Sequence, residues 1–222
     1  MAVAARRNET AESLLDAAER LLVTVGHAGL TTRRLAAEAR INAGLVHYYF
    51  GSVEEVFLQV LDRFTDRLIA RQRAMYAAEG PFLEKWQTAW RFQEEDLASG
   101  YNKIWLELQA MAWNRPELRA RVARVNGEWR AVLREAFARA LREYGLDERA
   151  WPVDVLSALV MTMGQGYQLE RLSGIDAGHA ALLDWIEQWL ASCEKGKRNH
   201  GARTEQTRAR GSAPRSARRR RR

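Results

Sequence analysis

The chain has 222 residues, of which 47% are apolar, so it can bury one or two hydrophobic cores. Its net charge of +7 arises in residues 195–222, which hold 12 basic residues and one acid, a net +11. Residues 1–194 therefore have a net charge of −4. The overall charge is thus no evidence that residues 1–194 bind nucleic acid. Cys193 is the only cysteine, which excludes an intrachain disulfide and favours a reducing, cytoplasmic compartment.

Helix-forming residues dominate and period-two alternation is scarce, which predicts an all-α fold of about nine helices. Residues 1–9 are polar and expected to be mobile. They lack the apolar segment of a signal peptide, and no stretch of the chain is apolar enough to cross a bilayer, so no membrane partner is expected. From about Thr10, apolar residues recur on one helical face, namely Leu14, Leu15, Ala18, Leu21, Leu22 and Val25. Gly26 and Gly29 are expected to end this helix.

Residues 31–52 are predicted to form two short helices joined by a tight turn. Thr31 or Thr32 can cap the first helix, because a threonine hydroxyl accepts a hydrogen bond from an unpaired backbone N–H. The apolar pattern then breaks at residues 40–44, where Ile41 is the one large apolar side chain. In the second helix Leu45 and Val46 are expected to face inward. This spacing is typical of a helix-turn-helix, whose second helix lies in the major groove of DNA.

A long fourth helix is predicted after the S-x-x-E capping box formed by residues 52–55. Its apolar series is Val56, Phe57, Val60, Leu61, Phe64 and Leu68. Because this helix extends past the small module, we expect it to connect that module mechanically to the rest of the chain. Five further helices are expected at residues 81–97, 101–113, 116–144, 152–174 and 176–194, each bounded by Gly, Pro or Asn. Residues 195–222 are expected to be a disordered basic tail, since they cannot bury enough apolar surface to offset their ordering entropy.

Residues 10–57 resemble the TetR (tetracycline-repressor) family of transcriptional regulators. The resemblance is carried by an amino-terminal helix ending in glycine, by residues 30–32 (LTT) and 36–39 (AAEA), and by residues 44–55 (GLVHYYFGSVEE). It implies a helix-turn-helix DNA-binding domain over residues 1–52 and a ligand-binding and dimerisation domain over residues 53–194. It also implies a homodimer that binds a palindromic operator, most often as a repressor, and that a small molecule releases from it.

Two positions depart from the family pattern. The family usually has glycine in the turn where this chain has Arg40, so a strained or shifted turn is expected. It commonly has lysine at the start of the fourth helix, where this chain has Val53, so one phosphate contact is missing. Backbone N–H groups at that helix start could still hold a phosphate.

The resemblance implies two sets of DNA-contacting residues. Those expected to reach the groove are Asn42, Ala43, Gly44, His47 and Tyr48, and those expected to contact phosphates are Thr32, Arg33, Arg34, Tyr48 and Tyr49. The alternatives are a solvated helix face for the two arginines, an ordinary surface histidine for His47, and core packing for Tyr49 and Phe50. For Phe50 core packing is the better interpretation.

Seven side chains of the later helices are candidates for a ligand cavity: Trp86, Trp90, Trp105, Met111, Trp129, Met163 and Tyr167. Ordinary core packing is the alternative for each. Tryptophan and methionine suit an aromatic or hydrophobic ligand, so an apolar effector is expected. The last two helices are expected to form the dimer, with Gly164 and Gly166 allowing close approach and Trp185, Ile186 and Trp189 supplying apolar surface; closing the monomer core is the alternative.

The remaining expectations concern the tail and rival functions. The arginine-rich tail is either a non-specific DNA tether or a solvated extension. No catalytic, metal or cofactor site is expected, because the chain lacks the common metal, nucleotide and nucleophile motifs and its histidines are scattered (His27, His47, His179 and His200). The protein is therefore not expected to be an enzyme. A helical small-molecule carrier remains an alternative, although it would not explain the amino-terminal motif.

Overall fold

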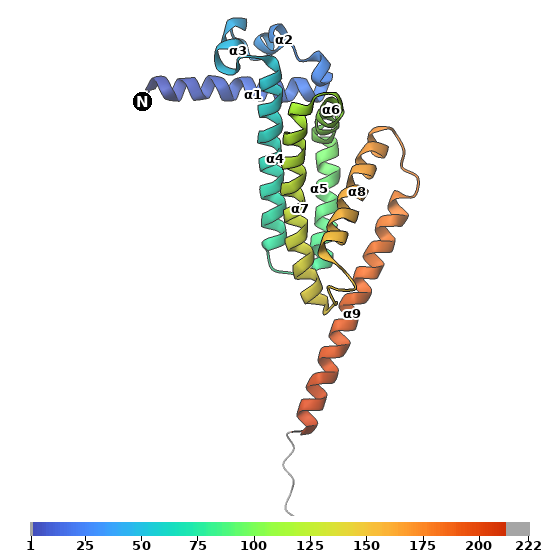
Figure 1. Cartoon of the computed structure of the whole chain (residues 1–222). Coiled ribbons are helices and arrows are strands. Elements are labelled where there is room, and N and C mark those ends of the chain that lie inside the picture. The colour runs from blue at the N-terminus through green and yellow to red at the C-terminus, as the bar shows by residue number, and fades with distance from the viewer. Residues whose placement is uncertain (1, 212–222) are drawn as a thin grey trace, which may run out of the picture.

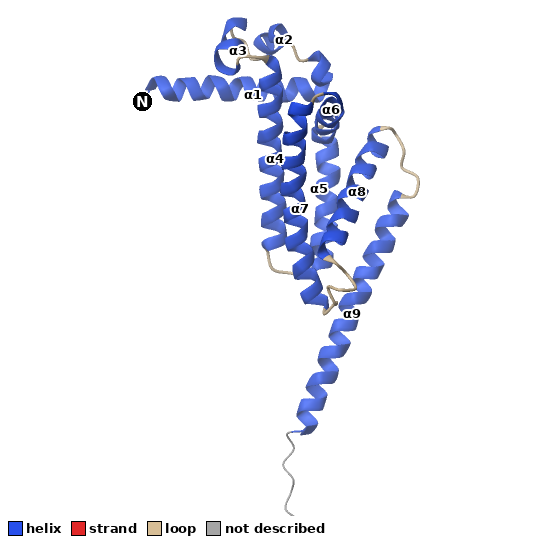
Figure 2. Ribbon diagram, in the orientation of Figure 1, coloured by secondary structure: helices blue, strands red, loops and turns tan. Residues whose placement is uncertain are grey.

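The computed structural model describes the backbone of residues 2–211 and the side chains of residues 8–196. Within that range the chain folds into nine α-helices joined by short loops, without a strand (Figures 1 and 2). The helices are α1 (Ala2–Gly29), α2 (Thr32–Glu38), α3 (Ala43–Phe50), α4 (Val53–Ala77), α5 (Phe82–Ala98), α6 (Tyr101–Asn114), α7 (Pro116–Tyr144), α8 (Val153–Leu172) and α9 (His179–Gly211). The predicted all-α class is confirmed.

The first helix is longer than predicted and is broken near its end. It begins at Ala2 rather than near Thr10, because the polar residues before Thr10 are largely good helix formers. Gly26 interrupts it with φ 70° and ψ −178°, and a last turn then continues to Gly29. The break lets the chain turn towards α2, while Leu14, Ala18 and Leu22 stay fully buried on the face below it.

Two buried clusters stabilise the molecule, and α4 and α7 contribute to both. The first cluster joins α1–α4 to α6 and the start of α7, and includes Phe57 and Leu61 of α4. The second joins the distal part of α4 to α5, α7, α8 and α9, and includes Ile69 and Tyr76 of α4. In Figure 1, α4 runs from the end that carries α2 and α3 down the length of the body, beside α7. The predicted role of α4 as a connection therefore agrees with its packing.

Ion pairs also fix α4 to its neighbours. Arg63 donates to Asp16 at 2.8 Å and to Glu19 at 2.5 Å, both on α1. The neighbouring residue of α4, Asp62, accepts from Arg121 at 2.5 Å and from Arg124 at 2.6 Å, both on α7. A displacement of α4 would have to break or carry along these contacts, so α4 is linked to both the amino-terminal module and the body.

The carboxyl-terminal helix also differs from its expected length. Disorder was expected from residue 195, but α9 continues to Gly211, since residues 195–211 contain many helix-forming residues even though they lack an apolar face. This part of α9 extends beyond the body, at the end opposite to α2 and α3 (Figure 1). The rest of the predicted tail, residues 212–222, lies outside the described residues.

Candidate functional site

The turn between α2 and α3 is built by local hydrogen bonds. Thr31 caps α2, its hydroxyl accepting from the Arg34 N–H at 3.2 Å. The chain then passes through Arg40 at φ 56°, which is the one positive φ among the described non-glycine residues. Asn42 caps α3, with its Oδ1 accepting from the Gly44 N–H at 2.8 Å. The expected strain at Arg40 is therefore present in the backbone.

Helix α3 is anchored by one face and exposed on the other. Val46 and Phe50 are buried in the first cluster, and Tyr49 packs partly against it, so the core interpretation of Phe50 agrees with the structure. Leu45 is only partly buried. Val53, where the family often has lysine, packs against the same cluster, which gives this departure a structural role.

The residues expected to reach the groove lie on the outer face. Asn42, Ala43, Gly44 and His47 are all exposed, and Tyr48 is 64% exposed, with its ring edge-on to Tyr49 at 5.1 Å. The Oδ1 atom of Asn42 is already engaged as a cap, which leaves its NH₂ group for an outside acceptor. This exposed face, made up of Asn42, Ala43, Gly44, His47 and Tyr48, is called the α3 outer face below.

His47 is held in a defined orientation on this face. Its Nδ1 lies 2.9 Å from the carbonyl oxygen of Gly51, and because a carbonyl can only accept, Nδ1 must donate. In the neutral ring Nε2 is then left as an acceptor that points away from its own helix end. The sequence contains a signal for this bond, because a glycine that can end a helix, Gly51, stands four residues after His47. In the structure Gly51 has φ 73° and ends α3.

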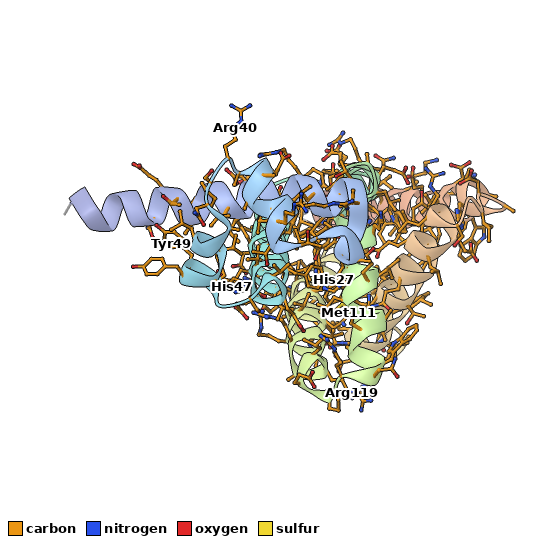
Figure 3. The ribbon with its side chains drawn as sticks, turned by 90° about the horizontal axis from the view of Figure 1, so that it is seen from above. His27, Arg40, His47, Tyr49, Met111 and Arg119 are labelled. Carbon is orange, nitrogen blue, oxygen red and sulfur yellow. The ribbon has the colours of Figure 1, made fainter. Side chains whose placement is uncertain are left out.

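The phosphate candidates border the same surface. Arg33 is exposed and Thr32 is half-buried at the start of α2. Arg34 is also exposed, but its Nη1 donates to the carbonyl oxygen of Gly29 at 3.3 Å, so it also holds the end of α1. Arg40, which the sequence analysis did not count as a contact, projects from the tip of the module (Figure 3).

A second candidate site is a partly open cavity of about 130 Å³ between the helices of the body. Residues from α4, α5, α6, α7 and α8 line it. Four of the seven predicted ligand-binding residues are among them, namely Trp86, Trp90, Trp105 and Trp129.

The other three predicted residues are not among the residues that line the cavity. Met111 packs partly against the first cluster. Met163 packs against the second cluster, and Met161, two residues earlier on α8, lines the cavity instead. Tyr167 contacts a lining residue, since its ring is 5.0 Å from that of Trp90, and its hydroxyl donates to Glu94.

The polar part of the lining was not predicted from the sequence. It comprises Gln72, Gln93, Asp96, Asn102, Asn126, Gln165 and Gln168, together with Tyr76 and Tyr101. Burial raises the pKa of Tyr101 to about 12, and its hydroxyl is paired with that of Thr65 at 3.1 Å. The available signal was positional: Gln72 stands four residues after Leu68, on the apolar face of α4.

Helix α6 lines the cavity and also contacts α1. Its first half supplies Asn102 and Trp105 to the cavity wall. Two residues after Trp105, Glu107 accepts from the backbone N–H of His27 at 2.8 Å, at the break in α1. A Cβ atom added at Gly26 would lie 2.7 Å from the same carboxylate, so glycine allows this close approach.

The outward sides of α8 and α9 carry exposed apolar side chains. On α8 these include Val155 and Leu159, which are 60% and 62% exposed, and on α9 Trp185 is 66% exposed. Ile186 and Trp189, also expected at a dimer interface, pack partly against the second cluster of their own chain. Gly166 is exposed on α8, whereas Gly164 lines the cavity.

These features define a class of protein, one with an outward helix-turn-helix on a helical body that carries a cavity between its helices. Residues 14–60 match the family model described as bacterial regulatory proteins, tetR family. The matched segment holds most of α1, all of α2 and α3 and the start of α4, so this part of the chain is a TetR-family regulatory domain.

Similarity to individual proteins is partial in sequence and extensive in fold. An uncharacterized HTH-type transcriptional regulator of Haemophilus influenzae is 28% identical over 94 residues, which are 40% of this chain and 50% of that protein, so the chain aligns with half of this relative. A transcriptional regulator of Saccharomonospora viridis in complex with choline has 19% identity and a TM-score of 0.67, over 83% of this chain and 95% of that one. The regulator FadR of Bacillus subtilis in complex with stearoyl-CoA has 14% identity and a TM-score of 0.65, over 82% and 98%. At such identities the structural similarity shows a common fold.

None of the helices within the described range combines the length and the hydropathy that a membrane span requires.

Proposed function

We propose that this protein is a ligand-responsive transcriptional regulator that binds a palindromic operator as a homodimer and leaves it when a small molecule occupies the cavity. In this proposal residues 1–52 form the DNA-binding domain and residues 53–194 the ligand-binding and dimerisation domain. The observation that carries the proposal is the exposure of the α3 outer face. Val46 and Phe50, on the opposite face of α3, are buried in the core and so orient the outer face towards solvent.

DNA binding would use the two kinds of contact that this surface offers. The Asn42 amide and His47 suit base edges, Ala43 suits a thymine methyl group, and Gly44 allows close approach of the backbone. Thr32, Arg33, Arg34, Tyr48 and Tyr49 suit phosphates, which fix the register of the helix without reading sequence. In a dimer the two α3 helices would enter successive major grooves about 34–36 Å apart.

The proposed dimer pairs α8 and α9 of one protomer with those of its partner. Leu159 and Trp185 are far more exposed than a side chain that only closes its own core, and an isologous four-helix contact would cover them. Exposed apolar surface of this kind often marks an interface.

Ligand response would pass through the helices that line the cavity. Two proteins of the same fold hold small molecules, choline in one and stearoyl-CoA in the other, which supports a ligand-binding role for the body. A ligand that favours a non-binding spacing of the α3 helices by about 1–3 kcal/mol would be enough to act as an effector. We propose repression as the sense of regulation, as the family resemblance implies.

Sequencing of the DNA that the protein retains tests the proposal. Purified protein is incubated with sheared DNA from its source organism, and the retained fragments are sequenced; we expect a shared inverted repeat. The variant His47→Ala should lose that enrichment while keeping its helical circular dichroism spectrum. If wild-type protein retains no common sequence, DNA recognition is contradicted.

The alternative function, a small-molecule carrier, makes a different prediction for the same variant. A carrier would bind its ligand and perform its whole activity with His47→Ala, and would retain no specific DNA. Loss of a sequence-specific complex in His47→Ala, with ligand binding intact, separates the regulator from the carrier.

A further inference from the structure

The cavity wall gathers buried polar atoms that the protein itself leaves without a partner. Ten buried side-chain atoms among the described residues have no hydrogen-bond partner, and half of them belong to side chains that line the cavity. These five are Gln72 Oε1, Trp86 Nε1, Gln93 Nε2, Asn102 Nδ2 and Gln168 Oε1. Buried polar groups are normally paired, so a cluster around one cavity indicates that its occupant supplies the partners.

Three of these side chains are almost wholly buried, with exposed fractions of 7% for Gln72, 4% for Trp86 and 2% for Asn102. The indole N–H of Trp86 can only donate, so it requires an acceptor. The two amides carry a carbonyl oxygen and an NH₂ group each, so they can meet both donors and acceptors. A ligand without polar atoms would leave all three groups unpaired.

The aromatic part of the wall sets the shape of the occupant. Trp86, Trp90, Trp105 and Trp129 line the cavity together with Tyr76 and Tyr101. The rings of Trp86 and Trp90 lie edge-to-face at 5.8 Å, on successive turns of α5. Such walls favour a flat ring system, which can stack on one ring and meet the edge of another.

The charges around the cavity already balance. Asp96 lines it and is 6% exposed, and Arg71 Nη2 lies 2.7 Å and 2.8 Å from its two carboxylate oxygens. Burial raises the pKa of Asp96, while the bonds from Arg71 act in the opposite direction. Among the described lining residues none is a lysine or arginine, so an anion would have no free positive partner there. A cation would meet a carboxylate that is already neutralised, and either ion would be desolvated without a matching charge.

We infer that the ligand of this cavity is an uncharged aromatic compound that carries both hydrogen-bond donors and acceptors. This inference rests on the proposed ligand-responsive function and refines it, since the aromatic residues alone led to the expectation of an apolar effector. The ring system fills the space between the tryptophans, and its polar atoms pair with Trp86, Asn102 and Gln72. A hydrocarbon, an organic cation and an organic anion are the competing classes.

Four two-ring probes of nearly equal size separate these classes: 2-quinolinone (neutral, donor and acceptor), naphthalene (apolar), N-methylquinolinium (cation) and 2-naphthoate (anion). Their affinities for the full-length protein are measured by quenching of tryptophan fluorescence and by calorimetry. We expect 2-quinolinone to bind about tenfold or more tightly than the other three, because only it carries both a donor and an acceptor without bringing a net charge into the cavity. Tighter or equal binding of any other probe, or no binding of 2-quinolinone, overturns the inference.

A matched pair of variants tests the role of the indole N–H. Trp86→Phe keeps a ring in the wall but removes the donor, whereas Trp113→Phe makes the same change at a side chain that is 73% exposed and outside the cavity lining. We expect Trp86→Phe to weaken 2-quinolinone about tenfold with little effect on naphthalene, and Trp113→Phe to change neither. Asn102→Leu provides a second test should Trp86→Phe fail to fold. If both cavity variants bind 2-quinolinone like wild type, the inference is overturned.

The same probes distinguish failure of this inference from failure of the proposed function. Binding is read from fluorescence and heat without DNA, and operator release is read separately from fluorescence anisotropy of a labelled operator. If 2-quinolinone binds selectively but no ligand that fills the cavity changes operator affinity, the ligand class stands and the regulatory role of the cavity is overturned. If another probe class binds best and releases the operator, the regulatory role stands and the ligand class is overturned.

Discussion

Arg40 occupies a backbone conformation that favours glycine, because at φ 56° a Cβ atom crowds the following carbonyl. Replacing it by glycine removes this strain but adds freedom to the unfolded chain, so we expect Arg40→Gly to stabilise the protein by about 0.5–1 kcal/mol. Urea unfolding followed by circular dichroism measures the change. The control is Arg33→Gly, inside α2 at an exposed position, which should destabilise by about 1 kcal/mol. Equal effects of the two substitutions would contradict the strain.

Asn42 has two roles in the proposal, a structural one as the cap of α3 and a functional one at the DNA surface. Two variants separate them. Asn42→Ala removes the cap and should cost about 1 kcal/mol of stability. Asn42→Asp keeps a capping oxygen but loses the NH₂ group and brings a negative charge towards DNA, so we expect near wild-type stability with operator affinity lowered about tenfold or more. Wild-type operator binding by Asn42→Asp would restrict this residue to capping.

Side chains set by local sequence were the predictable ones. The caps at Thr31 and Ser52, the break at Gly26 and the strain at Arg40 each depend on a few neighbouring residues, and the structure contains all of them. The orientation of His47 also follows from a local bond to the end of its own helix.

The elements of the fold were predictable for a related reason, since helical periodicity is a local property. Errors occurred where tertiary packing decides. The sequence shows that Met111, Met161 and Met163 all lie on apolar helices, but which of them faces a cavity depends on how five helices pack together, and only Met161 lines it. The polar lining of the cavity was not predicted, because the sequence does not show whether a single Gln at the edge of an apolar helix face is buried at a cavity or exposed to solvent.

Glu107 provides a test of how the two sites communicate. It holds the His27 N–H at the break in α1, and α6 also supplies cavity residues, so removal of this contact should uncouple the sites more than it weakens either. We expect Glu107→Ala to reduce the ligand-induced change in operator affinity by about fivefold. Anisotropy titrations with and without 2-quinolinone, or another bound ligand, measure this change. Glu107→Gln keeps an acceptor oxygen and serves as the control; if it behaves like the alanine variant, this hydrogen bond does not carry the coupling.

The course of α9 bears on the basic carboxyl-terminal segment. Residues 195–211 continue the helix away from α2 and α3 (Figure 1), so a tether to the same operator would have to span the length of the body. Each phosphate neutralised would add to the salt dependence of binding. We therefore expect a protein truncated after Glu194 to keep the wild-type slope of log affinity against log salt concentration. A markedly flatter slope would support the tether.

The protein would bind its operator tightly only as a dimer, because one α3 helix reads one half of a palindrome. Once the first half-site is bound, the α3 helix of the second protomer binds the other half-site in an intramolecular step. The exposed side chains of α8 and α9 are the surface that would hold the pair together, and Leu159 lies on the outward side of α8. Burying a lysine there without a partner is costly, so we expect Leu159→Lys to be monomeric at micromolar concentration in sedimentation velocity. Its affinity for a full operator should fall about a hundredfold, while its affinity for a half-site should not change.

The control for this change is Trp113→Lys, which places the same charge at a side chain that is 73% exposed on α6, a helix outside the proposed interface. It should remain dimeric and bind the full operator like wild type. In an isologous contact each substitution occurs on both sides, so Leu159→Lys would bring two lysines into the same apolar surface. If Leu159→Lys also sediments as a dimer, the proposed interface is therefore wrong. If both variants are monomeric together with wild type, the two α3 helices have no fixed spacing, and recognition of a palindrome would require assembly on the DNA itself.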